Sequence, residues 1–154
     1  MRPRRLVPVA LAAAGLVVIV IGIQQELVHV APGHEGRVVT GWGGELNHEE
    51  RLLAQLGAVG VAGAVAALRW RRLAVVPVAT GGVVLCYALR AVVYYALDPG
   101  LYTTVPVYGG TTRLVLGAEP ALLVAGGTLL VAAGIVRRRA ATERVPEGTP
   151  LTPT

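Results

Sequence analysis

The chain has 154 residues, of which 54% are hydrophobic and only 15% charged, and its net charge is +5. A soluble domain usually carries about 25% charged residues, so this composition points to a single domain with lipid as its solvent. The basic residues are all arginines, most of them beside apolar stretches, which indicates membrane topology rather than nucleic acid binding. Cys86 is the single cysteine, which excludes an internal disulfide and a CxxC motif.

Four apolar stretches predict membrane-spanning helices, at about 6–23, 52–68, 73–97 and 114–136. A spanning helix needs about 20 mostly apolar residues, which these stretches match or approach. The alternative for the first stretch is a cleaved signal peptide, whose apolar region has about 7–15 residues. We favour a retained helix, because this apolar run is longer and because Pro32 after Ala31 makes a poor cleavage site.

Residues 24–51 form a longer outer segment between the first two helices. Short apolar runs on both sides of Pro32 and Gly33 predict a small β-hairpin. Between the third and fourth helices, residues 102–108 also resemble a strand, and Pro106 would confine it to a sheet edge. We expect these strands to rest on the helix ends as a cap, since so small a sheet has no core of its own.

Three histidines, His29, His34 and His48, lie in this outer segment together with several glutamates. Imidazole and carboxylate groups are common ligands of zinc and copper. Their spacing matches no established metal motif. The sequence therefore predicts no cofactor, with an outer-face metal site on these histidines as an alternative.

The arginines set the expected orientation. They cluster before the first helix, in the turn between the second and third, and after the fourth: Arg2, Arg4, Arg5, Arg69, Arg71, Arg72, Arg137, Arg138, Arg139 and Arg144. The positive-inside rule therefore predicts that both termini are cytoplasmic. The expected fold is an all-α membrane protein, a four-helix transmembrane bundle over residues 1–139, N-in and C-in. A small β-hairpin caps its outer face, and residues 140–154 form a disordered cytoplasmic tail.

Small residues recur at helical spacing in two of the predicted helices. The second offers Ala54, Ala58, Ala62 and Ala66, with Gly57, Gly60 and Gly63 beside them, and the fourth offers Gly117, Ala121 and Ala125, then Gly126, Gly127 and Gly134. Because lipid is as apolar as leucine, membrane helices associate through close packing at such residues. Two interpretations stay open: these are packing or dimerisation faces, or they reflect a composition rich in alanine and glycine.

An arginine inside a span is costly unless it is paired. Arg90 lies about 8 residues inside the third predicted helix and Glu119 about 6 residues inside the fourth, so their depths match. We expect an ion pair between them that faces the bundle interior, with Tyr87 and Tyr94 on the face of Arg90. Pro120 would bend the fourth helix beside this charge. The cluster is interpreted as a structural clamp, as an ion or small-anion site, or as an arginine that reaches outward.

The plan of cytoplasmic ends, a longer first outer loop and a shorter second one resembles the tetraspan proteins of the claudin-like group. Residues 41–46, around Trp42, are similar to the tryptophan region of their first loop, but the paired cysteines of that family are missing. No residue role is carried over from it. In composition and topology the chain also resembles the many uncharacterised small four-helix integral membrane proteins of GC-rich prokaryotes, and this resemblance implies no activity.

The sequence contains no catalytic constellation, phosphate loop or dinucleotide motif, so we expect no enzyme. The leading hypothesis is a non-catalytic interaction or accessory subunit of the cell membrane. Its expected partners are the lipid bilayer and other membrane proteins or a second copy of itself. The alternatives are a small transporter or channel that uses Arg90, Glu119 and Tyr87, and the metal-binding protein described above.

Overall fold

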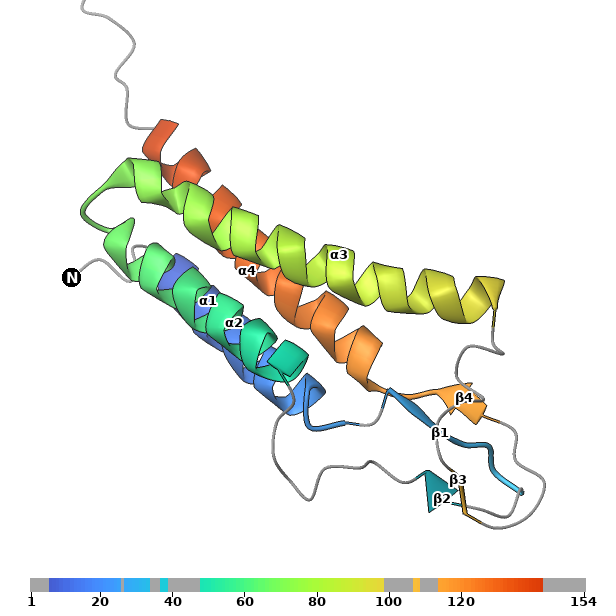
Figure 1. Cartoon of the computed structure of the whole chain (residues 1–154). Helices are drawn as coiled ribbons and strands as arrows, with labels where there is room; N and C mark the ends of the chain where they lie inside the picture. Colours follow the sequence, from blue (N-terminus) through green and yellow to red (C-terminus); the bar gives the residue numbers. More distant parts are fainter. Residues whose placement is uncertain are drawn as a thin grey trace, which may run out of the picture.

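The computed structural model contains four α-helices and describes residues 6–25, 27–33, 37–38, 48–98, 107–108 and 114–142. The helices are α1 (Val7–Gly22), α2 (His48–Ala66), α3 (Val75–Leu97) and α4 (Glu119–Thr142), and the 3-10 helix η2 (Arg71–Ala74) leads directly into α3. Consecutive helices run antiparallel (Figure 1), so the start of α1, the turn between α2 and α3 and the end of α4 lie at one end of the bundle, here called the turn end. The short strands lie at the opposite end, here called the strand end. The prediction of four helices is confirmed.

The bounds of α4 differ most from the predicted span. Residues 114–116 form the strand β4 (Leu114–Leu116), and α4 begins only at Glu119. Pro120 suits this start, because a proline without an N–H is accepted in the first helical turn. The N–H of Leu122 then donates to the carbonyl of Ala118 over 3.1 Å. The bend expected at Pro120 is therefore a helix start, and at its other end α4 continues through the arginines to Thr142.

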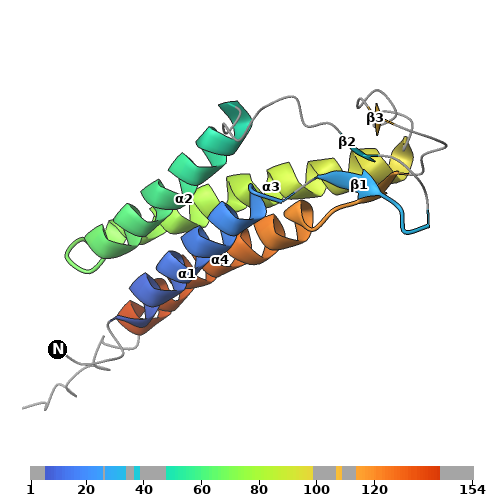
Figure 2. The ribbon, with the colours of Figure 1, turned by 90° about the horizontal axis from the view of Figure 1, so that it is seen from below.

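Two short antiparallel strand pairs occupy the strand end. The strand β1 (Val28–Val30) pairs with β4, and β2 (Arg37–Val38) pairs with β3 (Val107–Tyr108). The expected hairpin within 24–51 is therefore wrong in its pairing, since the two strands described in that segment pair with strands that follow α3. The helices explain this: β1 follows α1 and β4 precedes α4, and α1 and α4 lie side by side (Figure 2). The N–H of Gly117, which donates to the carbonyl of Leu27 over 2.7 Å, extends this ladder.

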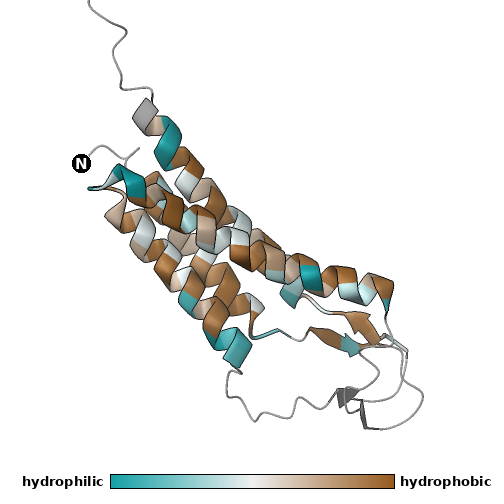
Figure 3. Ribbon diagram, turned by 45° about the horizontal axis from the view of Figure 1, so that its top comes forward, coloured by the Kyte–Doolittle hydropathy of each residue, from teal (hydrophilic) through white to brown (hydrophobic). Residues whose placement is uncertain are grey.

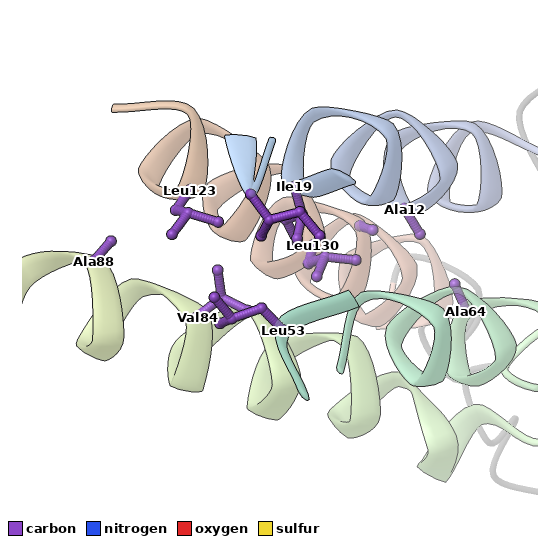
Figure 4. Packing of buried hydrophobic residues seen from close by; sticks show 10 residues of the cluster. Ala12, Ile19, Leu53, Ala64, Val84, Ala88, Leu123 and Leu130 are labelled. Atoms are coloured by element: carbon purple, nitrogen blue, oxygen red, sulfur yellow. The ribbon is translucent and has the colours of Figure 1, made fainter. Parts of the chain in front are cut away.

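Helix α4 packs between α1 and α3, and two adjacent glycines allow both close approaches. A Cβ atom at Gly126 would lie 2.6 Å from Cγ1 of Ile19 on α1, and one at Gly127 would lie 2.9 Å from Cγ of Leu85 on α3. Adjacent helix positions point about 100° apart, so neighbouring glycines can serve two different helices. Buried apolar side chains from all four helices close around this crossing (Figure 4): Ala12, Ile19, Leu53, Ala64, Val84, Ala88, Leu123 and Leu130.

Three glycines of α2 allow its close approach to neighbouring helices. Gly57, Gly60 and Gly63 are buried, and a Cβ atom at Gly60 would lie 2.8 Å from Oγ1 of Thr80 on α3. Four alanines of the predicted stripes are exposed instead: Ala58, Ala62, Ala121 and Ala125. The glycines face inward because only a residue without a side chain allows this approach.

The outer surface of the bundle carries large apolar side chains on every helix. Exposed examples are Val17 and Ile21 on α1, Val59 and Val65 on α2, Val83 and Leu89 on α3, and Ile135 on α4. Hydrophilic residues lie mostly near the helix ends (Figure 3). Two helical stretches, Arg71–Leu97 and Glu119–Ala140, are long and apolar enough to cross a membrane. The apolar helix α1 is shorter, with 16 residues, and α2 begins with charged residues.

An arginine of α4 closes the turn end. Nε of Arg137 donates to the carbonyl of Ala67 over 2.9 Å, and Nη2 donates to the carbonyl of Leu68 over 3.2 Å. These carbonyls follow the last turn of α2, where backbone acceptors lack helical donors and the helix dipole is negative. Arg137 therefore caps α2 and ties it to α4.

We expect Arg137→Ala to lower the free energy of unfolding by about 1.5 kcal/mol, because two carbonyls lose a charged donor. Thermal unfolding in detergent micelles measures this difference. Arg139→Ala is the matched control, since Arg139 is exposed and has no hydrogen bond or ion pair to the described residues. Equal losses in both variants would contradict a capping role for Arg137.

Candidate functional site

A polar cluster lies at the strand end, where three helices meet. Helix α3 contributes Tyr87, Arg90 and Tyr94, α2 contributes Glu49 and Glu50 from its first turn, and α4 contributes its first residue, Glu119. Helix α3 continues past the starts of α2 and α4 (Figure 1). The cluster therefore lies level with two helix starts, with further turns of α3 beyond it.

The relative level of the two predicted partners follows from the α3–α4 crossing. Gly81 on α3 approaches the carbonyl of Gly127 on α4. In an antiparallel pair, Arg90, nine residues after Gly81, then lies level with residue 118, next to Glu119. Both residues are thus at the start of α4, and Glu119 is not several residues inside a helix as expected.

Tyr87 joins α3 to α2. Its hydroxyl donates to Oε2 of Glu49 over 2.7 Å, a charge-assisted hydrogen bond. Thr80, seven residues earlier and so on the same face of α3, contacts Gly60 of α2, which explains why Tyr87 also faces α2. Glu49 is favoured in the first turn of α2, because the helix dipole is positive there.

Arg90 does not form the expected ion pair with Glu119. Its Cζ lies 5.8 Å from the ring centroid of Tyr87 and 5.8 Å from that of Tyr94. Within the described residues, the Arg90 side chain forms these two cation–π contacts and no hydrogen bond or ion pair. The two side chains do not meet because Arg90 points away from α4. Leu85 faces α4, and Arg90, five residues later, points about 140° away from that direction around the axis of α3. Arg90 is therefore an exposed cation held between two aromatic rings.

Glu119 lies among carboxylates instead. The negative charges of Glu50 and Glu49 act on it from α2. Glu49 and Glu50 are missing from the sequence-predicted cluster. Their place in the first turn of a helix antiparallel to α3 was the signal that could have found them.

Two of the three candidate metal-binding histidines are described. His29 is exposed on β1 and His48 is the first residue of α2, while His34 lies outside the described residues. In the part of the chain that the structure describes, no group of three or more histidine, cysteine, aspartate and glutamate side chains could hold a metal ion. The polar cluster at the strand end instead provides a guanidinium group, aromatic rings and carboxylates.

We expect Tyr87→Phe to lower the free energy of unfolding by about 1–2 kcal/mol, because Glu49 loses a charge-assisted hydrogen bond between two helices. Tyr94→Phe is the matched control. Tyr94 is also on α3 and also contacts Arg90, but its hydroxyl has no hydrogen bond within the described residues. Chemical denaturation of both variants in detergent measures the difference. Equal stability of the two would mean that the hydrogen bond from Tyr87 to Glu49 does not stabilise the bundle.

The chemistry of this cluster suits binding to charged or dipolar groups. A positive end at Arg90 and a negative end at Glu49 lie on the two sides of Tyr87. Helix α3 holds Arg90 and both tyrosines on one rigid element, and the hydrogen bond from Tyr87 fixes the start of α2 beside them. Comparisons of the chain with protein-family models, with curated proteins and with solved structures find no match.

Proposed function

We propose that all four helices span the cell membrane, with both termini and the turn between α2 and α3 in the cytoplasm. The apolar outer surface on every helix supports this, because such a surface would be costly in water. The arginines at the turn end support the orientation, since Arg69, Arg71, Arg72 and Arg137–Arg139 all belong to that end. The strand end, with its glutamates, then faces outward.

The length of α1 fits a bilayer that is locally thin. The 16 residues of α1 span about 24 Å, against about 30 Å for a typical hydrocarbon core. The 23 residues of α3 span about 35 Å, so α3 passes the outer boundary set by its shorter neighbours. A bilayer adapts to such differences by thinning and by helix tilt at modest cost. On this basis Arg90 lies near the outer interface.

Within this membrane we propose a non-catalytic interaction or accessory subunit. The observation that supports it best is the apolar interior of the bundle. Among the described residues, Thr80 is the single buried polar side chain, and its hydroxyl donates to the carbonyls of Val76 and Pro77 in its own helix. A transport path needs polar groups along the interior, and this core provides side chains such as Leu123 and Leu130 instead.

Orientation is tested by cysteine labelling. Cys86→Ala removes the single cysteine and gives a cysteine-free background. An impermeant maleimide added to intact cells should label His29→Cys, at the strand end, and should label Arg72→Cys, at the turn end, only after lysis. Labelling of both positions in intact cells would contradict the proposed orientation.

The accessory role is tested by reconstitution. Purified protein in liposomes should give no flux of protons, sodium, potassium or chloride above that of protein-free liposomes. Crosslinking in native membranes should give defined adducts with another membrane protein or with a second copy. Flux that Arg90→Ala and Glu119→Ala abolish in folded protein would overturn the accessory role in favour of a transporter.

A further inference from the structure

Three side chains form a charged row across the outer surface of α2 and α3, here called the Arg90–Tyr87–Glu49 row. Arg90 lies 5.8 Å from the ring of Tyr87, whose hydroxyl donates to Glu49 over 2.7 Å. Arg90 and Glu49 are both exposed and do not pair with each other. The row therefore has a positive end, an aromatic middle and a negative end.

Both charged ends of the row keep unused hydrogen-bonding capacity. The guanidinium group of Arg90 contacts only aromatic rings within the described residues, so its N–H donors have no acceptor there. The carboxylate of Glu49 accepts the hydroxyl of Tyr87 at Oε2 and has no other hydrogen bond in the described part of the chain. A ligand that carries an anionic and a cationic group could engage both ends at once.

The surface on the turn-end side of the row is apolar. Val83, seven residues before Arg90 on the same face of α3, is 51% exposed, and Cys86 is also exposed. Leu52, three residues after Glu49 on α2, is 49% exposed. Charged groups at one level with an apolar strip beside them match a molecule with a polar head and hydrocarbon chains.

We propose that the Arg90–Tyr87–Glu49 row binds the headgroup of a zwitterionic phospholipid in the outer leaflet. The phosphate accepts hydrogen bonds from Arg90, and the amine donates to Glu49. The acyl chains run along the apolar strip that includes Val83 and Leu52. This assignment rests on the proposed membrane insertion.

The same charges predict which phospholipids are disfavoured. The exposed carboxylate of Glu49 places a negative charge beside the position of the headgroup. A lipid with an uncharged glycerol headgroup would bring its phosphate to this region without a compensating cation, and like charges would repel it. Phosphatidylethanolamine should therefore bind more tightly than phosphatidylglycerol with the same acyl chains.

The test is native mass spectrometry of the full chain, purified in detergent and supplied with equal amounts of the two lipids. The wild-type protein should retain phosphatidylethanolamine about tenfold more than phosphatidylglycerol, since a hydrogen bond to a charged group is worth at least that factor. Arg90→Gln should abolish this retention. Glu49→Gln should remove the preference between the lipids, and its amide oxygen still accepts the hydroxyl of Tyr87, which preserves the fold.

Arg139→Gln serves as the matched control, because it removes an exposed arginine at the turn end and should leave lipid retention unchanged. Thermal unfolding of each variant separates lost binding from lost folding. Equal retention of the two lipids by wild-type protein, or unchanged retention by Arg90→Gln, would overturn the proposal. So would displacement of the lipid by an equal concentration of soluble phosphorylethanolamine, because the acyl chains would then contribute nothing. Flux by the wild-type protein and the cysteine labelling are measured without these variants, so failure here and failure of the proposed function are distinguishable.

Discussion

Gly81→Ala should lower the free energy of unfolding by about 1–3 kcal/mol, the usual cost of adding a methylene or methyl group to a close-packed site. A Cβ atom at Gly81 would lie 2.6 Å from the carbonyl oxygen of Gly127 and 2.9 Å from Cβ of Leu130. Both are atoms of α4 that cannot move without the helix. The α3–α4 crossing must therefore open, and the intrinsic preference of alanine for helices offsets only part of this cost.

The neighbouring glycine provides the control for this prediction. A Cβ atom at Gly82 would meet nothing within 4 Å. Gly82→Ala should therefore leave stability unchanged or raise it by up to about 1 kcal/mol, because alanine is the better helix former. Chemical denaturation in detergent micelles, followed by circular dichroism, measures both variants. A gain in stability for both would contradict the close helix crossing at Gly81.

The helices could be predicted from the sequence because apolar length is a local property. The predicted stretch 73–97 begins two residues after the start of η2 and ends with α3, and 6–23 matches α1 within one residue at each end. The strand β4 could not be predicted in the same way. Residues 114–116 are as apolar as a helix start, and they become a strand only because β1, far away in sequence, lies beside them. Such pairing depends on the packing of α1 against α4.

The candidate site could be predicted on one helix but not between helices. The spacing of Tyr87, Arg90 and Tyr94 along α3 gave their common face, and the structure has Arg90 between the two rings. To predict whether Arg90 pairs with Glu119, one must know how α3 is rotated about its axis. The depth of the two residues and their spacing in the sequence do not determine this rotation. That rotation is set by packing at Gly81 and Leu85, and it turns Arg90 away from α4. The contact between Tyr87 and Glu49 depends on the same rotation.

Val59→Arg should nearly abolish membrane integration of α2, because an arginine at the centre of a spanning helix costs about 2.5–3.5 kcal/mol on insertion scales. Val59 is 50% exposed near the middle of α2, so the new side chain would point away from the bundle. The same change on a surface that faces water would alter stability by only about 0.5 kcal/mol. Impermeant maleimide labelling of Arg72→Cys in intact cells measures integration of α2, because this position becomes accessible from outside when α2 does not cross.

Leu52→Arg is the control for depth. Leu52 is 49% exposed on the same helix, so it matches Val59 in exposure, but it lies beside Arg51 in the first turns of α2. An arginine there can reach the outer interface with its long side chain, and integration should fall only slightly. The four-span arrangement requires the two variants to differ, because only lipid makes the cost of a charge depend on its depth. Equal integration of Val59→Arg, Leu52→Arg and the wild-type protein would mean that the outer face of α2 lies in water, and α2 would then not be a span.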